Sequence, residues 1–272
     1  MQWARIWLEY VLARGALALF ALLPRATAID VAMQISRALL RFFPKLQRIG
    51  LRNLQIAFPD LSAGEREDLL TRSVENLGRV FGELSHLRDD TPESLAARID
   101  FSGAPETLAR YRAERAEKRP IIFVTPHLGN WEILVLAVSA LIEPIAYLAR
   151  PLDNPLLDAT TTRIRTRFGN RAISKHDSVM EGLEVLDHGG VLGMLADVNT
   201  LMRDGVFVPF FGRPACTTRA VAMLAMRTNA LILPICGVWH KETQRYVAIP
   251  GEFIEVARTG KRRDDIVETT AR

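Results

Sequence analysis

Residues 121–141 read IIFVTPHLGNWEILVLAVSAL and hold three segments of different character. The run Ile121–Thr125 is apolar or β-branched, which is typical of a buried strand. The run Trp131–Leu141 is mostly apolar and long enough for a helix. A short loop joins the two runs and carries His127. We therefore expect His127 at the carboxyl end of a strand, where sites gather in folds that alternate strands and helices.

The same alternation continues along the chain. Asp177 and Gly189 bracket one of the helical stretches as its N-cap and its C-terminal stop. The expected strands are Ile121–Thr125, Ile145–Ala149, Val191–Ala196 and Leu231–Ile235, and the expected helices are Trp131–Leu141, Pro155–Phe168, Ser178–Leu186 and Thr217–Thr228. This order predicts an α/β fold with a mixed, mostly parallel sheet flanked by helices.

The composition of the 272 residues sets the class of protein. Hydrophobic residues make up 49% and charged residues 24%, so a sizeable core can form and disorder is excluded. Two cysteines, Cys216 and Cys236, are too few for a disulfide framework. The net charge of +4 comes from the N-terminus, because residues 1–60 hold eight Lys or Arg and three Asp or Glu. No basic patch with interleaved aromatic residues is visible, so we expect no nucleic-acid partner and favour an anionic membrane surface.

Residues 1–28 are expected to anchor the chain at a membrane, either across it or in its interface. The stretch from Ile6 to Leu23 is mostly apolar, although Glu9 and Arg14 interrupt it. Aromatic residues at positions 3, 7 and 10 suit the membrane–water interface. A cleaved signal peptide and an ordinary core helix are the alternatives.

A basic amphipathic segment follows, with a kink at Pro44. Its apolar side chains are Ile35, Leu39, Phe42, Phe43 and Leu46, and its basic side chains are Arg37, Arg41, Lys45 and Arg48. A solvated face of a bundle helix is the alternative. The sequence SAGE at 62–65 predicts a capping box that opens a helix toward Leu87. We expect residues 29–272 to form a single α/β domain, with a helical lead-in over 29–95 and a catalytic core over 96–272.

The spacing of His127 and Glu132 predicts a catalytic pair. On a continuous helix, side chains five residues apart point about 140° from each other. On a loop that enters a helix, Glu132 can turn back and accept a hydrogen bond from the imidazole, which gives a general base and an orienting carboxylate. A purely structural histidine is the alternative, but Gly129 and Asn130 let the backbone approach a ligand. A metal-dependent hydrolase that uses His127, Glu132 and Asp197 is a further alternative.

The stretch from His127 to Glu132 resembles the HX4E motif of the lysophospholipid acyltransferase superfamily. Over residues 5–272, the chain more closely resembles the lipid A biosynthesis (lauroyl/myristoyl) acyltransferase family. Three further blocks carry the likeness in the family's order: Arg52-Asn53-Leu54 with Ala57-Phe58-Pro59; Arg150-Pro151 with Asn154-Pro155-Leu156 and Arg165; and Asp197 with Val206–Gly212, Ala215 and Thr217. Two features depart from the family's pattern. Val198 replaces a usual glutamine, and the chain stops at Arg272 in what reads as the middle of a helix, as a truncated sequence would.

The resemblance implies an acyltransferase without cofactor or metal. The donor would be an acyl carrier protein or acyl-coenzyme A thioester. The acceptor would be a hydroxyl of a lipid A precursor at the cytoplasmic face of a bacterial inner membrane. His127 would act as general base and Glu132 would hold its imidazole. Substrate-binding roles are implied for Gly129, Asn130, Arg150, Asn154, Arg165, Asp197, Phe210, Gly212 and Thr217.

Several details of this interpretation stay open. Backbone N–H groups at Gly129 and Asn130 are candidate donors to the oxyanion. Arginines 163, 165, 167 and 171 are predicted to hold lipid phosphate or an acidic carrier protein, or else to form a solvated helix face. The run 206–211 is predicted to line an acyl groove or to belong to the core. The alternative functions are acyl transfer to another glycolipid, such as phosphatidylinositol mannoside, and non-catalytic lipid binding on the same fold.

Overall fold

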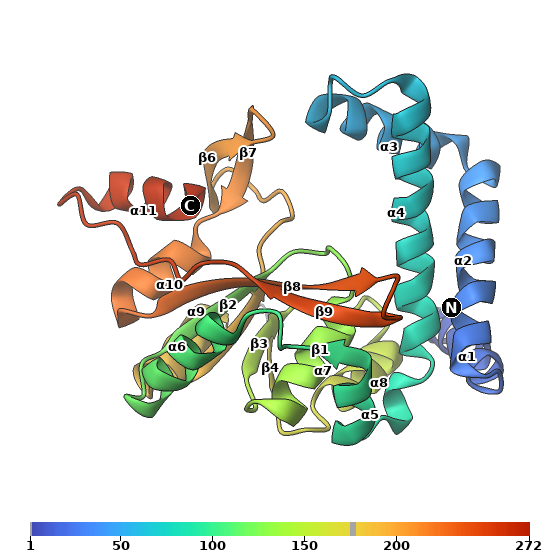
Figure 1. The fold of residues 1–272 in the computed structure, drawn as a ribbon, viewed down its shortest axis with the longest axis horizontal. Coiled ribbons are helices and arrows are strands. Elements are labelled where there is room, and N and C mark those ends of the chain that lie inside the picture. Colours follow the sequence, from blue (N-terminus) through green and yellow to red (C-terminus); the bar gives the residue numbers. More distant parts are fainter. Residues whose placement is uncertain (1, 175–177) are drawn as a thin grey trace. The chain divides into compact units, whose positions relative to one another are not determined.

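The structure is a computed structural model that describes residues 2–174 and 178–272. The chain divides into two compact units, Met1–Asp90 and Thr91–Arg272. The first unit is helical, and the second contains the sheets (Figure 1).

The described residues of the first unit form four α-helices and one short 3-10 helix: α1 Gln2–Ala21, α2 Arg25–Phe42, α3 Pro44–Ala57, α4 Ala63–Leu84 and η1 Leu87–Asp89. The capping box is confirmed at the start of α4. There the Ser62 hydroxyl accepts from the Glu65 N–H, and the Glu65 carboxylate accepts from the Ser62 N–H. Pro44 is the first residue of α3, so the predicted kink at Pro44 is a break between α2 and α3. Among residues 2–174 and 178–272, no helix combines the length and the apolar character needed to cross a membrane.

Helices α2 and α4 pack closely because two glycines of α4 face α2. A Cβ at Gly78 would lie 2.7 Å from the Ala32 carbonyl oxygen, and a Cβ at Gly82 would lie 2.7 Å from the Cα of Ile29. Near the same end of the pair, Arg25 donates through Nε to the Glu83 carboxylate at 2.8 Å. The Glu83 side chain is fully buried, so this ion pair supplies the counter-charge that a buried carboxylate requires.

In the second unit, helices and strands alternate. Its helices are α5 Pro92–Arg98, α6 Pro105–Ala116, α7 Trp131–Leu141, α8 Pro155–Arg165, α9 Ser178–Asp187, α10 Ala220–Thr228 and α11 Arg262–Ala271. Its strands are β1 Ile99–Asp100, β2 Ile121–Thr125, β3 Ala146–Ala149, β4 Arg171–Ser174, β5 Val191–Leu195, β6 Gly205–Phe210, β7 Arg213–Thr218, β8 Leu231–His240 and β9 Arg245–Pro250.

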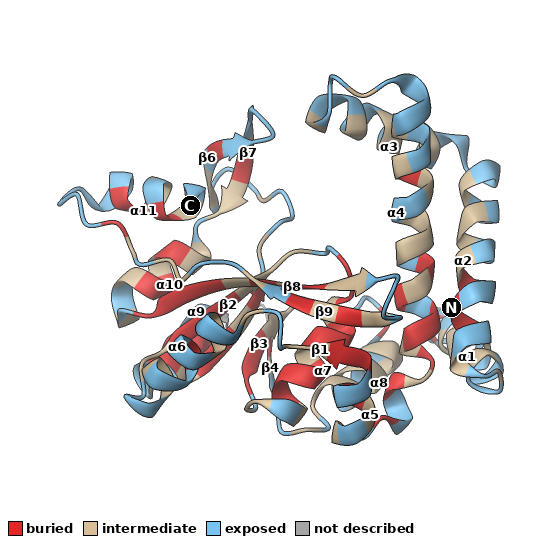
Figure 2. Ribbon diagram, viewed as in Figure 1, coloured by how far each residue is buried: buried red, intermediate tan, exposed pale blue. Residues whose placement is uncertain are grey.

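Seven strands form one sheet in the order β1-β9-β8-β2-β5-β3-β4, and only β8 and β9 run antiparallel. Ile122, Leu192 and Ile232 point from the central strands to one face, where Leu183 of α9 and Leu224 of α10 cover them. Figure 2 shows buried residues along these strands. The predicted α/β fold with a mostly parallel sheet flanked by helices is therefore confirmed.

Some predicted boundaries differ from the structure. The helix expected over Thr217–Thr228 begins only at Ala220, because Thr217 lies in β7 and pairs with Val206. Strands β6 and β7 form a separate antiparallel hairpin that was not predicted. Gly189 follows α9 with φ +70°, as expected of a C-terminal stop. The N-cap predicted at Asp177 lies outside the described residues.

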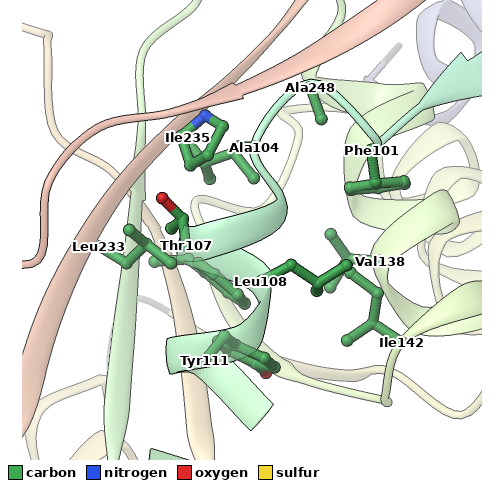
Figure 3. A pocket seen from close by; sticks show the side chains of 12 residues that line it. Phe101, Ala104, Thr107, Leu108, Tyr111, Val138, Ile142, Leu233, Ile235 and Ala248 are labelled. Carbon is green, nitrogen blue, oxygen red and sulfur yellow. The ribbon is translucent and has the colours of Figure 1, made fainter.

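On the other face of the sheet, an apolar recess lies between α6, α7 and strands β2, β8 and β9 (Figure 3). Tyr111 of α6 stacks on Phe123 of β2, with ring centroids 5.5 Å apart.

The Tyr111 hydroxyl donates to Glu143 at 2.7 Å, and Arg115 donates to both Glu143 oxygens at 2.8 and 3.0 Å. Burial alone would raise the pKa of Glu143, but these hydrogen bonds outweigh it and hold that pKa below its ordinary value of 4.5.

The depressed pKa makes the second unit sensitive to acid through Glu143. Unfolded chains protonate this carboxylate near 4.5, whereas the folded chain resists protonation, so its contribution is complete above 4.5 and is lost as pH falls through the lower folded value. We expect Glu143→Gln to cost about 1–3 kcal/mol of unfolding free energy at pH 7. We also expect the variant to lose less stability than wild type as pH falls from 4.5 through the lower folded value.

Urea unfolding at a series of pH values measures both effects. Glu117→Gln, at an exposed carboxylate directly after α6, is the control and should follow the wild-type curve. If the unfolding free energy of Glu143→Gln falls with decreasing pH as steeply as that of wild type, Glu143 does not contribute to the acid sensitivity.

Candidate active site

The parallel pairing of β2 with β5 brings two reactive side chains together. The pairs run from Ile121↔Val191 to Thr125↔Leu195, so each partner lies 70 residues further along the chain. Both strands then end at the carboxyl edge of the sheet. His127 lies two residues beyond the end of β2, and Asp197 lies two residues beyond the end of β5. The strand pairing therefore places the two residues side by side.

Asp197 holds His127 at two points. One carboxylate oxygen lies 2.8 Å from the imidazole Nδ1, and the other accepts from the His127 backbone N–H at 2.8 Å. The Trp131 ring meets the imidazole edge to face, with centroids 4.9 Å apart. The His127 side chain is 40% exposed, and no hydrogen bond from a described residue occupies its Nε2. This arrangement fixes the ring and leaves Nε2 open to a substrate proton.

The prediction that Glu132 accepts a hydrogen bond from His127 is wrong. Glu132 lies in the first turn of α7, and its carboxylate is bound by Arg165 of α8, with Nε donating at 2.8 Å and Nη2 also donating. The Trp131 indole N–H donates to the same carboxylate at 3.1 Å. The Glu132 side chain is 11% exposed and that of Arg165 is 22% exposed. The carboxylate that contacts His127 is therefore that of Asp197. Glu132 forms a largely buried ion pair that joins α7 to α8.

The buried ion pair affects neighbouring titratable groups. Burial by itself would lower the pKa of Arg165, but the hydrogen bonds to Glu132 outweigh burial, and the pKa of Arg165 is raised. Burial raises the pKa of Tyr147 on β3, whose hydroxyl is buried without a hydrogen-bond partner among the described residues. Arg165 thus stays charged, and Tyr147 stays neutral.

The loop between His127 and α7 is fixed by its contact with β8. Gly129 has φ +71°, and a Cβ there would lie 1.9 Å from the Gly237 carbonyl oxygen. The Asn130 N–H donates to that same oxygen at 2.8 Å. The expectation that the Asn130 N–H is free to bind an oxyanion is therefore wrong, because the loop continues the pairing with β8.

The Asn130 side chain is fully buried and ties the helix start to the sheet. Its carbonyl oxygen accepts from the N–H groups of Glu132 and Ile133 at 3.1 Å, which caps α7. Its amide donates to the Tyr246 hydroxyl of β9 at 3.2 Å. The sequence did not single out Tyr246 or Gly237, because neither belongs to a recognisable local motif.

The remaining expected substrate residues lie in three places. Asn154 is buried and caps α8 by accepting from the N–H groups of the residues at 156 and 157. Arg150 is exposed and pairs with Asp153 at 3.0 Å. Phe210 and Gly212 lie at the turn of the β6–β7 hairpin, and Thr217 lies on β7. Substrate contacts by these residues stay predictions.

Comparison with known proteins shows what the whole chain is similar to. Residues 1–271 match the family described as bacterial lipid A biosynthesis acyltransferase. A lipid A biosynthesis lauroyltransferase of Escherichia coli (strain K12) is 29% identical over 232 residues, which cover 85% of this chain and 73% of that protein. A lipid A biosynthesis myristoyltransferase of the same strain is 24% identical over 231 residues, which cover 85% of this chain and 70% of that protein. The resemblance seen in the sequence is thereby confirmed.

The contact between Gly129 and β8 predicts a strict requirement for glycine. Gly129→Ala would strain a left-handed backbone and also place Cβ inside the Gly237 carbonyl. Gly260→Ala meets only the first cost, since its φ is +86° and no heavy atom lies within 4 Å of the added Cβ. We expect Gly129→Ala to lose at least about 2 kcal/mol more unfolding free energy than Gly260→Ala. Chemical denaturation of both variants checks this, and equal losses would contradict the close approach.

Proposed function

This chain belongs to the bacterial lipid A biosynthesis acyltransferase family, and we propose that it transfers a fatty acyl chain to a hydroxyl of a lipid A precursor. Family membership makes the chain an acyltransferase. The acyl donor in this proposal is a thioester of acyl carrier protein or of coenzyme A. The observation that supports it best is the His127–Asp197 pair at the open edge of the sheet, in a chain similar to enzymes of that reaction.

In the proposed reaction, His127 is the general base. Its Nε2 takes the proton of the acceptor hydroxyl as the oxygen attacks the thioester carbonyl, which forms the new C–O bond. Collapse of the tetrahedral intermediate breaks the C–S bond, and the proton held by His127 passes to the departing thiolate. Asp197 accepts from Nδ1–H, keeps Nε2 unprotonated before the reaction and stabilises the imidazolium during it.

Glu132 has a positioning role in this proposal. Its ion pair with Arg165 fixes the first turn of α7, and that turn follows directly on the loop that carries His127. Trp131 links the two groups, because its ring contacts the imidazole and its N–H donates to Glu132. Loss of Glu132 would therefore disturb the site through the fold and leave the base with its own carboxylate.

We further propose that the chain works at the cytoplasmic face of a bacterial inner membrane, held there by residues 1–28. Helix α1 exposes several large apolar side chains: Trp3, Trp7, Leu8, Val11, Leu12 and Leu19. Burying such side chains in the acyl boundary of a bilayer is favourable, and nearby basic residues add attraction to anionic headgroups.

The two carboxylates should differ when each is neutralised. We expect His127→Ala and Asp197→Asn each to lower turnover by about 10²–10⁴ while leaving the melting temperature near wild type. The amide that replaces the Asp197 carboxylate would donate to Nδ1 and force the proton onto Nε2. Glu132→Gln should instead lower stability by about 3 kcal/mol, because it leaves the Arg165 charge buried without its counter-charge. Mass spectrometry of the acyl chain added to a lipid A precursor gives turnover, and calorimetry gives stability.

The opposite pattern would contradict the assignment. If Glu132→Gln is fully stable yet as inactive as His127→Ala, and Asp197→Asn stays active, then Glu132 orients the base. Acylation of a different glycolipid by wild type, with the lipid A precursor left unmodified, would contradict the proposed acceptor.

Membrane retention should depend on apolar insertion by α1. Replacing Trp7, Leu8 and Leu12 with serine removes side chains that are 53%, 60% and 63% exposed. We expect the triple variant to leave the membrane fraction, and wild type to stay there in about 1 M salt, where the Debye length is about 3 Å. Leu77→Ser in α4, at a side chain 58% exposed, is the control and should be retained. Release of wild type by salt alone would make the attachment electrostatic.

A further inference from the structure

The tip of the β6–β7 hairpin has an unusual turn. Phe210 pairs with Arg213, so Phe211 and Gly212 form a two-residue turn, with φ +48° and +69°. Two positive φ angles in succession define the type I′ turn, which favours asparagine, aspartate or glycine. Gly212 suits this geometry, whereas Phe211 does not.

The other non-glycine residues with positive φ in the described part of the chain are Lys118, Asn229 and Gln244. All three have polar side chains, which are compatible with exposed turns. Phe211 alone among these four combines the disfavoured backbone with a large apolar side chain, and it remains 50% exposed. Neither turn geometry nor core packing therefore accounts for a phenylalanine at this position.

The tip presents apolar rings beside a cation. Residues 209–214 read PFFGRP and are all exposed. The rings of Phe210 and Phe211 contact each other with centroids 4.7 Å apart, and Phe210 is 58% exposed. Arg213 follows directly, so the tip combines two aromatic rings with a guanidinium. An apolar insert flanked by a basic residue matches the interface of an anionic bilayer.

The backbone of the tip favours lipid over another strand. Pro209 lies directly opposite Pro214, and neither has an N–H group. A partner strand added to this end of the hairpin would find no donor at these two positions. The hairpin tip also enters an apolar environment more easily, because an unsatisfied N–H group is costly there and these two prolines have none.

The hairpin is rooted at the same edge of the sheet as the catalytic pair. The loop 196–204 leads from Asp197 to β6, and the Thr200 N–H donates to the Cys216 carbonyl at 3.0 Å, which fastens this loop to β7. Leu201 and Met202 in this loop are 60% and 77% exposed. Figure 1 shows the hairpin standing off the main sheet of its unit.

We infer that the β6–β7 tip inserts Phe210 and Phe211 into the surface of a phospholipid bilayer, with Arg213 against anionic headgroups. This inference rests on the proposed function at a membrane and adds a second contact, made by the catalytic unit itself. The tip would hold the edge that carries His127 and Asp197 close to the lipid surface, where a lipid acceptor presents its hydroxyl.

A fluorophore at position 211 tests the insertion. In full-length chain with Cys216 and Cys236 replaced by alanine, Phe211→Cys is labelled with an environment-sensitive dye. The labelled protein is then mixed with vesicles of phosphatidylcholine and phosphatidylglycerol, without any acyl thioester. We expect a blue shift and quenching by lipids that carry a nitroxide on the acyl chain. Gln244→Cys, at another exposed left-handed turn position, is the matched control and should show neither effect.

A second variant separates binding from folding. Phe211→Asn suits the type I′ turn, so we expect no fall in the melting temperature but about tenfold weaker vesicle binding. If the protein binds vesicles but the label at position 211 stays in water, the inference about the tip is wrong, whereas the proposed membrane attachment stands. A blue shift with a soluble acyl thioester and no vesicles would assign the tip to the substrate chain and also overturn it. A chain that binds no vesicles would overturn both this inference and the proposed membrane attachment, whereas a loss of acyl transfer alone would contradict only the proposed reaction.

Discussion

The pairing of β2 with β5 is the constraint on which the active site depends. A parallel ladder fixes the relative position of two strands along their whole length, and here it joins residues separated by 70 positions. A shift of this register would separate the imidazole of His127 from the Asp197 carboxylate. The hydrogen bonds between them are 2.8 Å long only because the two loops leave the sheet side by side. The reactive pair is thus a consequence of strand pairing in the core.

The surrounding contacts keep the loop of His127 in one conformation. Asn130 caps α7 and also binds β8 and β9 through its backbone and side chain. Glu132 and Arg165 fasten the first turn of α7 to α8 with a largely buried ion pair. Each contact uses a group that sequence motifs would assign to substrate or catalysis. In the structure, these groups hold the loop of His127 in place.

Local patterns in the sequence predicted the elements well, but long-range pairings were hidden. Strand β2 and helix α7 have the predicted bounds, because apolar runs are local signals. The HX4E spacing drew attention to Glu132, while the true partner of His127 lies far along the chain and depends on the order of strands in the sheet. The available signal for Asp197 was its place directly after the predicted strand Val191–Ala196, just as His127 follows the predicted strand Ile121–Thr125. The β6–β7 hairpin was missed because Phe211-Gly212 lacks the usual asparagine of its turn type.

The protonation site of His127 is the most direct test of the claim that Asp197 orients the base. Nitrogen-15 NMR at neutral pH, with the His127 signal assigned from its absence in His127→Ala, distinguishes the two tautomers. The account predicts a proton on Nδ1 in wild type and in Glu132→Gln, and a shift to Nε2 in Asp197→Asn. A wild-type proton on Nε2, or a tautomer that changes in Glu132→Gln but not in Asp197→Asn, would contradict it.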